Sequence, residues 1–182
     1  YLEFYLRAER CQFRVLLPHE VTEGYMVGLR EQRKYLINTK KKITLPVQSA
    51  YVARILESSD NLLFGFFVEG ELVGTSGIQT FGKPCQERIS NDVPYATLGV
   101  FVFDPSDRDK GYGKTMIWAG VYLLNSTLKM NSFRAAMEKQ NIPSLRTFLS
   151  CGFQKYEEAD DTFKLSLVID QLKKPEFVTD IS

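Results

Sequence analysis

The residues of this chain best suited to chemistry are glycines and cations that follow an apolar run. Leu98 to Phe103 predicts a strand, and a helical pattern with apolar residues on one face begins after Gly113. The segment between them holds Arg108, Lys110, Gly111, Gly113 and Lys114. Glycine lets backbone N–H groups approach a phosphate closely, and the start of a helix adds roughly half a positive charge. The pattern predicts a binding site for a phosphorylated cofactor.

The spacing of these residues excludes two common nucleotide-binding loops. A Walker A loop requires Gly-x-x-x-x-Gly-Lys-Ser/Thr, and Gly113-Lys114-Thr115 supplies only its end, because the first glycine would fall at Arg108. A dinucleotide-binding fingerprint requires a third glycine three residues after Gly113, and that position is Met116. What remains is Arg-x-x-Gly-x-Gly between a strand and a helix.

A second segment, Asn141 to Phe153, has the pattern of a short capped helix. Asn141 is a favourable N-cap, Pro143 falls in the first turn, where its missing N–H costs nothing, and Gly152 ends the helix. Together with the phosphate turn that precedes it, this segment resembles the acyl-CoA motifs of the GCN5-related N-acetyltransferase (GNAT) superfamily. The resemblance covers about Phe13 to Ile169, nearly the whole chain.

The resemblance implies that acetyl-CoA is the co-substrate and that a neutral amine attacks its thioester directly, in a ternary complex. In the superfamily the pantetheine arm pairs with the strand before the phosphate turn, which here corresponds to Phe101, Val102 and Phe103. The backbone around Phe101 would also polarise the thioester carbonyl. The residues that would hold the pyrophosphate are Arg108, Asp109, Lys110, Gly111, Tyr112, Gly113 and Lys114. From the second motif, Asn141, Ser144 and Phe148 would face the arm.

The positions that correspond to the superfamily's catalytic base depart from its pattern. Many members have a glutamate six residues before the Phe103 position, where this chain has Thr97. A threonine can orient a water but does not take a proton at neutral pH. Glu138, just before the Asn141 helix, is a substitute base, and its other interpretation is an exposed charge at the end of a strand.

The position of the expected acid departs as well. Many members have a tyrosine seven residues after the asparagine, where this chain has Phe148, and Tyr95 or Tyr122 are the substitutes available. A thiolate leaves tolerably well unaided, so this loss slows the reaction without preventing it. We expect Phe148 to pack against the thiol end of the cofactor; the alternative is that it is ordinary helix core.

These segments must be positioned by the remaining elements of an α+β fold, a GNAT-like mixed central sheet flanked by helices. The expected strands are 13–17, 62–68, 72–81, 94–103, 133–137 and 162–169, and the expected helices are 21–36, 47–56, one after Gly113 and one after Asn141. Glu69-Gly70-Glu71 predicts a hairpin turn. We expect a single domain over 1–182, with a core at about 13–169 and a polar tail at 173–182 that frays.

Composition sets limits on the functional class. The 182 residues are 44% hydrophobic with a formal net charge of +1, so neither nucleic acid nor a membrane surface is expected as a partner. His19 is the only histidine, and the cysteines Cys11, Cys85 and Cys151 lack ligand spacing, so no metal site is expected. Scattered cysteines and the absence of a visible signal peptide favour a cytoplasmic enzyme. We expect it to be a monomer or a homodimer.

The acceptor is expected to be a small-molecule amine. Glu20 to Tyr25, Lys34 to Leu36 and Leu63 to Gly65, taken with the second cofactor motif, resemble the branch of ribosomal-protein N-terminal and nucleotide-amino-sugar acetyltransferases. A nucleotide-linked amino sugar has a weakly basic amine and a pyrophosphate that Lys40, Lys41 and Lys42 could bind. The alternatives are a peptide α-amino group and, from a different class, a catalytically silent acyl-CoA-binding module.

Overall fold

A single mixed sheet organises the described part of the chain. The structure is a computed structural model that describes residues 1–32, 44–79 and 95–179. Within these ranges nine strands form one sheet in the order β7-β8-β6-β5-β4-β3-β2-β1-β9. The strands are β1 Leu2–Leu6, β2 Glu9–Val15, β3 Asn61–Val68, β4 Glu71–Gln79, β5 Ala96–Val102, β6 Ser132–Glu138, β7 Gln154–Glu158, β8 Thr162–Val168 and β9 Val178–Thr179.

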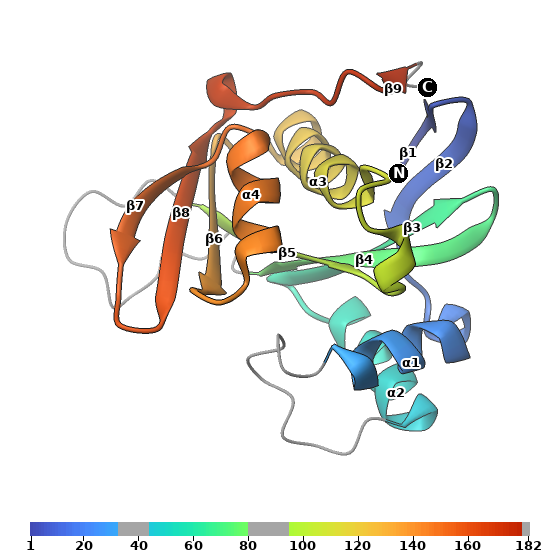
Figure 1. The fold of residues 1–182 in the computed structure, drawn as a ribbon. Helices are drawn as coiled ribbons and strands as arrows, with labels where there is room; N and C mark the ends of the chain where they lie inside the picture. The colour runs from blue at the N-terminus through green and yellow to red at the C-terminus, as the bar shows by residue number, and fades with distance from the viewer. Residues whose placement is uncertain (33–43, 80–94, 180–182) are drawn as a thin grey trace.

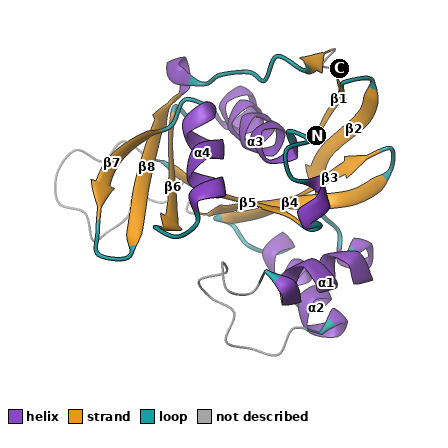
Figure 2. Ribbon diagram, viewed as in Figure 1, coloured by secondary structure: helices purple, strands orange, loops and turns teal. Residues whose placement is uncertain are grey.

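Helices cover both faces of this sheet (Figures 1 and 2). The helices α3 (Tyr112–Leu128) and α4 (Ile142–Ser150) lie on one face, and α1 (Glu23–Glu31) and α2 (Leu45–Leu56) lie on the other. Short 3₁₀ turns occupy Pro18–Glu20, Pro105–Asp107 and Ile169–Gln171. No helix in the described ranges has the length and apolar character needed to span a membrane. The arrangement confirms the expected α+β architecture.

Two hydrophobic clusters hold the layers together. The larger lies between the sheet and α3, where Met116, Ile117 and Val121 are fully buried against strand residues that include Phe66 and Leu98. The smaller joins α1 and α2 to β3 and β5 through residues that include Met26, Val52, Leu63 and Phe103. Because α3 is buried on most of its surface, it is a rigid base for the turn that precedes it.

The local signals predicted most of the central elements. Glu69 and Gly70 form the β3–β4 turn with φ values of 48° and 84°, as the hairpin pattern predicted. The first helix begins at Glu23, after an N-cap in which the Thr22 hydroxyl accepts a hydrogen bond from the Tyr25 N–H at 3.2 Å. It ends at Glu31, with Gln32 as its C-cap, short of the predicted end at residue 36. Residues 33–36, the lysines 40–42, Cys85 and the predicted loop at 84–92 lie outside the described residues.

Three strands were not predicted, and the bounds of the first predicted strand were wrong. The first predicted strand begins at Glu9 instead of Phe13, and β1 pairs with it through a turn at Arg7 and Ala8. β7 pairs with β8 beyond the last strand that we expected. The expectation of a frayed tail is also wrong up to Thr179, because β9 pairs with β1 and the segment before it crosses α3 (Figure 1).

Candidate active site

β5 and β6 are parallel neighbours that part soon after they meet. In the described structure they pair at Ala96 with Phe133 and at Thr97 with Arg134. From there β5 stays paired with β4 as far as Val102, while β6 stays paired with β8 along its whole length. Figure 1 shows the two strands diverging. The inner edge of β5 is therefore left with backbone groups that have no strand partner.

The alternation of the ladder decides which backbone groups these are. The Phe103 N–H donates to the Val73 carbonyl at 3.1 Å, so Phe103 and, two residues earlier, Phe101 direct their polar groups toward β4. The residues between them, Val100 and Val102, direct their polar groups toward the gap. The groups available to an added strand are therefore the N–H and carbonyl of Val100 and the N–H of Val102, whose carbonyl accepts from Gln32. They are not the Phe101 and Phe103 groups that we expected from the sequence.

Gln32, whose role has no signal in the sequence, links the end of β5 to the phosphate turn. Its side-chain amide donates to the Val102 carbonyl at 2.9 Å and to the Phe103 carbonyl at 2.8 Å. Its amide oxygen accepts from the Arg108 guanidinium at 3.2 Å. Gln32 thus holds Arg108 beside the last residues of the strand.

The phosphate turn ends in an uncapped helix N-terminus. The Asp104 carboxylate accepts from the Ser106 N–H at 2.8 Å and starts a 3₁₀ turn, after which Asp109 and Gly111 take φ values of 67° and 90°. Gly111 is the N-cap of α3 and supplies no side-chain acceptor. The first amides of α3, at 112–114, have no acceptor within their helix, as at every helix start. They are available to an anion.

The cations of the turn differ in how fully they are engaged. Lys110 is paired with Asp107 at 2.6 Å, which neutralises much of its charge. Arg108 is exposed, with Gln32 as its partner, and Lys114 has no ion pair among the described residues. Arg108 and Lys114 are thus the cations better placed to meet a phosphate.

The second motif forms the expected capped helix, but its aromatic residue is core. The Asn141 side-chain oxygen accepts from the Ser144 N–H at 3.3 Å, which leaves the Asn141 amide N–H groups as donors. Phe148 is 2% exposed and meets Phe153 edge-on, with ring centroids 5.0 Å apart. This is the packing expected of the core alternative, so no exposed ring stands at this position. Its expected contact with the cofactor stays a prediction.

The face of β5 turned away from α3 presents a bare stretch of backbone. Thr97, Gly99 and Phe101 alternate on this face, because Leu98 packs toward Gly120 of α3 on the other. Gly99 is exposed and lies opposite Gly77 of β4. A Cβ at Gly99 would meet no described atom within 4 Å. Glycine inside a strand often marks a position where a ligand or another backbone comes close.

An aromatic stack closes the far end of this face. Tyr25 of α1 stacks on Phe103 with ring centroids 4.4 Å apart, and its hydroxyl accepts from the Gln48 side chain at 2.8 Å. Burial raises the pKa of Tyr25 to about 12, so it keeps its proton at neutral pH. The close fit requires Gly28, since a Cβ there would lie 2.7 Å from the Phe103 carbonyl oxygen.

The candidate catalytic residues share this face but do not touch. Thr97 of β5 pairs with Arg134 of β6. Phe101 and Glu138 each lie four residues farther along their strands, so they are at the same level across the gap. The Gln140 side chain donates to the Glu138 carboxylate. Of the substitute acids, Tyr95 lies under the Arg134 guanidinium at 3.9 Å. Tyr122 stacks on Trp118 of α3, which packs on the other face of the sheet.

The sequence matches the model of a known protein family. The model of an acetyltransferase (GNAT) domain matches residues 13–154, which is most of the chain. The chain belongs to the GNAT acetyltransferase family. No curated protein sequence matches it.

In the described ranges no group of three or more His, Cys, Asp or Glu side chains could hold a metal ion.

Solved structures share the fold at low sequence identity. RimJ from Mycobacterium smegmatis in complex with CoA-disulfide has a TM-score of 0.77 at 14% identity, covering 94% of this chain and 88% of its own. Aminoglycoside acetyltransferase AAC(6')-Ib with coenzyme A has a TM-score of 0.71 at 16% identity. The match covers 88% of this chain and 96% of the acetyltransferase chain. Spermidine N-acetyltransferase from Vibrio cholerae with CoA and spermine has a TM-score of 0.71 at 12% identity, with the same coverage.

The contact between α1 and the end of β5 yields a test with a matched control in the same helix. Gly28→Ala should lower the free energy of unfolding by about 1–3 kcal/mol, because the added methyl group overlaps the Phe103 carbonyl. Gly24→Ala has room, with the nearest atom at 3.8 Å, and should be neutral or stabilise by up to about 1 kcal/mol. Urea denaturation measures both. Equal effects at the two glycines would contradict the close contact.

Proposed function

We propose that this GNAT protein transfers the acetyl group of acetyl-CoA to a primary amine of a small molecule. One observation carries the proposal: β5 parts from β6 after Thr97 and continues to the phosphate turn and the uncapped N-terminus of α3, so that a free strand edge leads to an anion site. A molecule with an amide-containing arm joined to a pyrophosphate matches that sequence of groups, and acetyl-CoA is such a molecule.

The residues present fit this co-substrate at three places. The arm pairs as an added strand with the backbone of Val100 and with the N–H of Val102, whose carbonyl is held by Gln32. The pyrophosphate lies at the amides of 112–114, with Arg108 and Lys114 supplying full charges. Asn141 donates its side-chain amide to the arm from the opposite side of the gap.

The reaction on the open face is a direct displacement. The neutral amine nitrogen attacks the thioester carbonyl carbon, a C–N bond forms, and the C–S bond breaks with departure of the CoA thiolate. The amine loses a proton to water held by Thr97, which passes it to solvent, and the thiolate takes a proton from solvent. Glu138 lies about 13 Å farther along the gap, at the Phe101 level, and is the alternative acceptor for an amine bound there. Orientation in the ternary complex supplies much of the rate, because the face offers no strong acid.

The same face and the structural neighbours support a small-molecule amine as the acceptor. The bare stretch at Gly77 and Gly99 leaves room for a compact amine beside the thioester. One structural neighbour is an aminoglycoside acetyltransferase in complex with ribostamycin, and another is a spermidine N-acetyltransferase in complex with spermine. RimJ is a third structural neighbour. We retain the nucleotide-linked amino sugar and the peptide α-amino group as acceptors to be assayed. The lysines 40–42, which suggested the former, lie outside the described residues.

We place this enzyme in the cytoplasm. The described cysteines Cys11 and Cys151 are buried free thiols. Burial raises the pKa of Cys11 to about 12 and that of Cys151 to about 11, so both stay protonated and unreactive. Neither thiol needs an oxidising compartment, and neither suits a role as a nucleophile.

Gly113 tests the pyrophosphate site. Gly113→Val should weaken CoA binding about tenfold or more, because a branched side chain at the helix start crowds both Thr147, 3.2 Å from the added Cβ, and the phosphates. Gly24→Val, in the first turn of α1, is the matched control and should leave CoA affinity unchanged. Calorimetry on both folded variants measures the effect. Undiminished CoA affinity in Gly113→Val would remove the phosphate assignment.

Gly99 tests the acceptor side separately. Gly99→Val should leave CoA affinity within about twofold but cut kcat/KM for the amine by about 100-fold, because the side chain enters the space where the amine attacks. The assay is acetyl transfer to aminoglycosides, polyamines, nucleotide-linked amino sugars and N-terminal peptides. CoA binding without transfer to any amine would favour the silent acyl-CoA-binding module. Transfer to peptides alone would reassign the acceptor.

A further inference from the structure

The C-terminal segment 173–179 lies across the start of α3 and is anchored at both ends. At one end the Lys173 N–H donates to the Cys151 carbonyl at 3.0 Å. At the other, Val178 and Thr179 pair with β1. Between them the Phe177 ring lies against Gly111, where a Cβ would approach it to 2.6 Å, and the Phe177 carbonyl accepts from the Arg7 N–H at 3.2 Å. We call this segment the strap; it lies beyond residue 154, where the family match ends.

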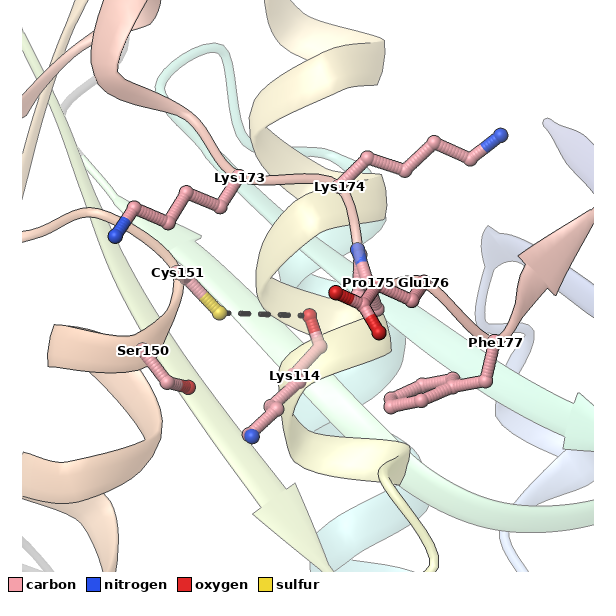
Figure 3. Close-up of a pocket in the computed structure, with 8 residues that line it drawn as sticks. All are labelled: Lys114, Ser150, Cys151, Lys173, Lys174, Pro175, Glu176 and Phe177. Carbon is pink, nitrogen blue, oxygen red and sulfur yellow. Dashed lines mark hydrogen bonds between the residues drawn. The ribbon is translucent and has the colours of Figure 1, made fainter.

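The strap lines an open cavity of about 340 Å³ over the first turn of α3. The lining comes from α3, the end of α4 and the strap: Lys114, Ser150, Cys151, Lys173, Lys174, Pro175, Glu176 and Phe177. Figure 3 shows these residues around a common space, with the side chains of Lys173 and Lys174 extending from the strap in opposite directions and Lys114 on the facing helix. Lys114 belongs both to this cavity and to the phosphate turn, so the two sites adjoin.

The charge of the lining favours a compact anion. Three lysines and one glutamate give it a formal charge of +2, while the whole chain carries only +1. Among the described residues none of these lysines has a carboxylate partner; Lys174 has only the Trp118 ring, 5.6 Å from its nitrogen. An ammonium group is a compact point charge that binds phosphate well. Cys151 contributes no chemistry, since its buried thiol points at the Lys114 carbonyl.

CoA carries one group that suits this cavity. Its pyrophosphate is an internal diester, whereas the phosphate on its ribose 3' oxygen is a monoester that approaches two negative charges at neutral pH. We propose that the strap cavity binds the ribose 3'-phosphate of CoA, with Lys173 and Lys174 as the residues that discriminate CoA from 3'-dephospho-CoA. This inference rests on the proposed function, because it takes CoA to lie with its pyrophosphate at 112–114.

Glu176 sets a limit on the strength of this site. Its carboxylate lines the same cavity, and Figure 3 shows it between Lys114 and Lys174. A carboxylate repels a phosphate, so the cavity favours the monoester through its net charge and at less than the full strength of three cations. Glu176→Gln removes the repulsion without changing the shape of the strap, and it gives a variant in which affinity should rise.

The experiment compares CoA with 3'-dephospho-CoA by calorimetry. The unaltered protein should bind CoA about tenfold more tightly than 3'-dephospho-CoA. Lys173→Ala combined with Lys174→Ala should bring the two affinities to within about twofold by weakening CoA alone. Lys155→Ala combined with Lys164→Ala is the control: it removes the same charge from β7 and β8, outside the cavity, and should keep the tenfold preference. Glu176→Gln should increase the preference for CoA.

The outcomes separate this inference from the function on which it rests. Equal affinity of the unaltered protein for both ligands, or a tenfold preference that survives loss of both strap lysines, would overturn the strap site and leave acetyl transfer intact. Absence of binding to either ligand would overturn the proposed function. Adenosine 3',5'-bisphosphate serves as a second probe: it should bind to the unaltered protein and lose affinity in the strap variant. Thermal melting of each variant confirms that the fold is retained.

Discussion

The parting of β5 from β6 is the constraint on which the rest of the site depends. Each strand is held by its other neighbour, β5 by β4 and β6 by β8, so the sheet stays intact while a free edge opens inside it. Unpaired backbone groups in a protein interior carry a free-energy cost, and a ligand that supplies the missing partners recovers it. The free edge is therefore a binding site because of its backbone, and the side chains around it refine what it accepts.

Packing on both sides fixes the position of this edge. On one face α3 is buried along most of its length and sets the place of the phosphate turn. On the other, Gly28 lets α1 lie against the Phe103 carbonyl, Tyr25 stacks on the Phe103 ring, and Gln32 joins the strand end to Arg108. The strap then covers Gly111. The cofactor elements thus receive support from segments far apart in the sequence.

The sequence predicted what local chemistry encodes, and it failed where contacts are long-range. Glycines, a capping asparagine and an apolar run sufficed for the turn, α3 and α4. The five residues of β7 are all exposed and show no alternation, so only their pairing with β8 reveals a strand. β1 has an alternating pattern, but its turn at Arg7 and Ala8 lacks glycine. Neither Gln32 nor Phe177 has a sequence signal, because each acts through contacts with residues far away in the sequence.

Amide hydrogen exchange with residue resolution tests the central claim most directly. If the arm of CoA adds to the free edge of β5, the Val100 and Val102 amides should exchange quickly in the free protein and become protected when CoA binds. The Phe103 amide, already bonded to Val73, should be protected in both states. Protection of Val100 and Val102 without CoA, or no change at these amides in a complex that calorimetry shows to be saturated, would contradict the account.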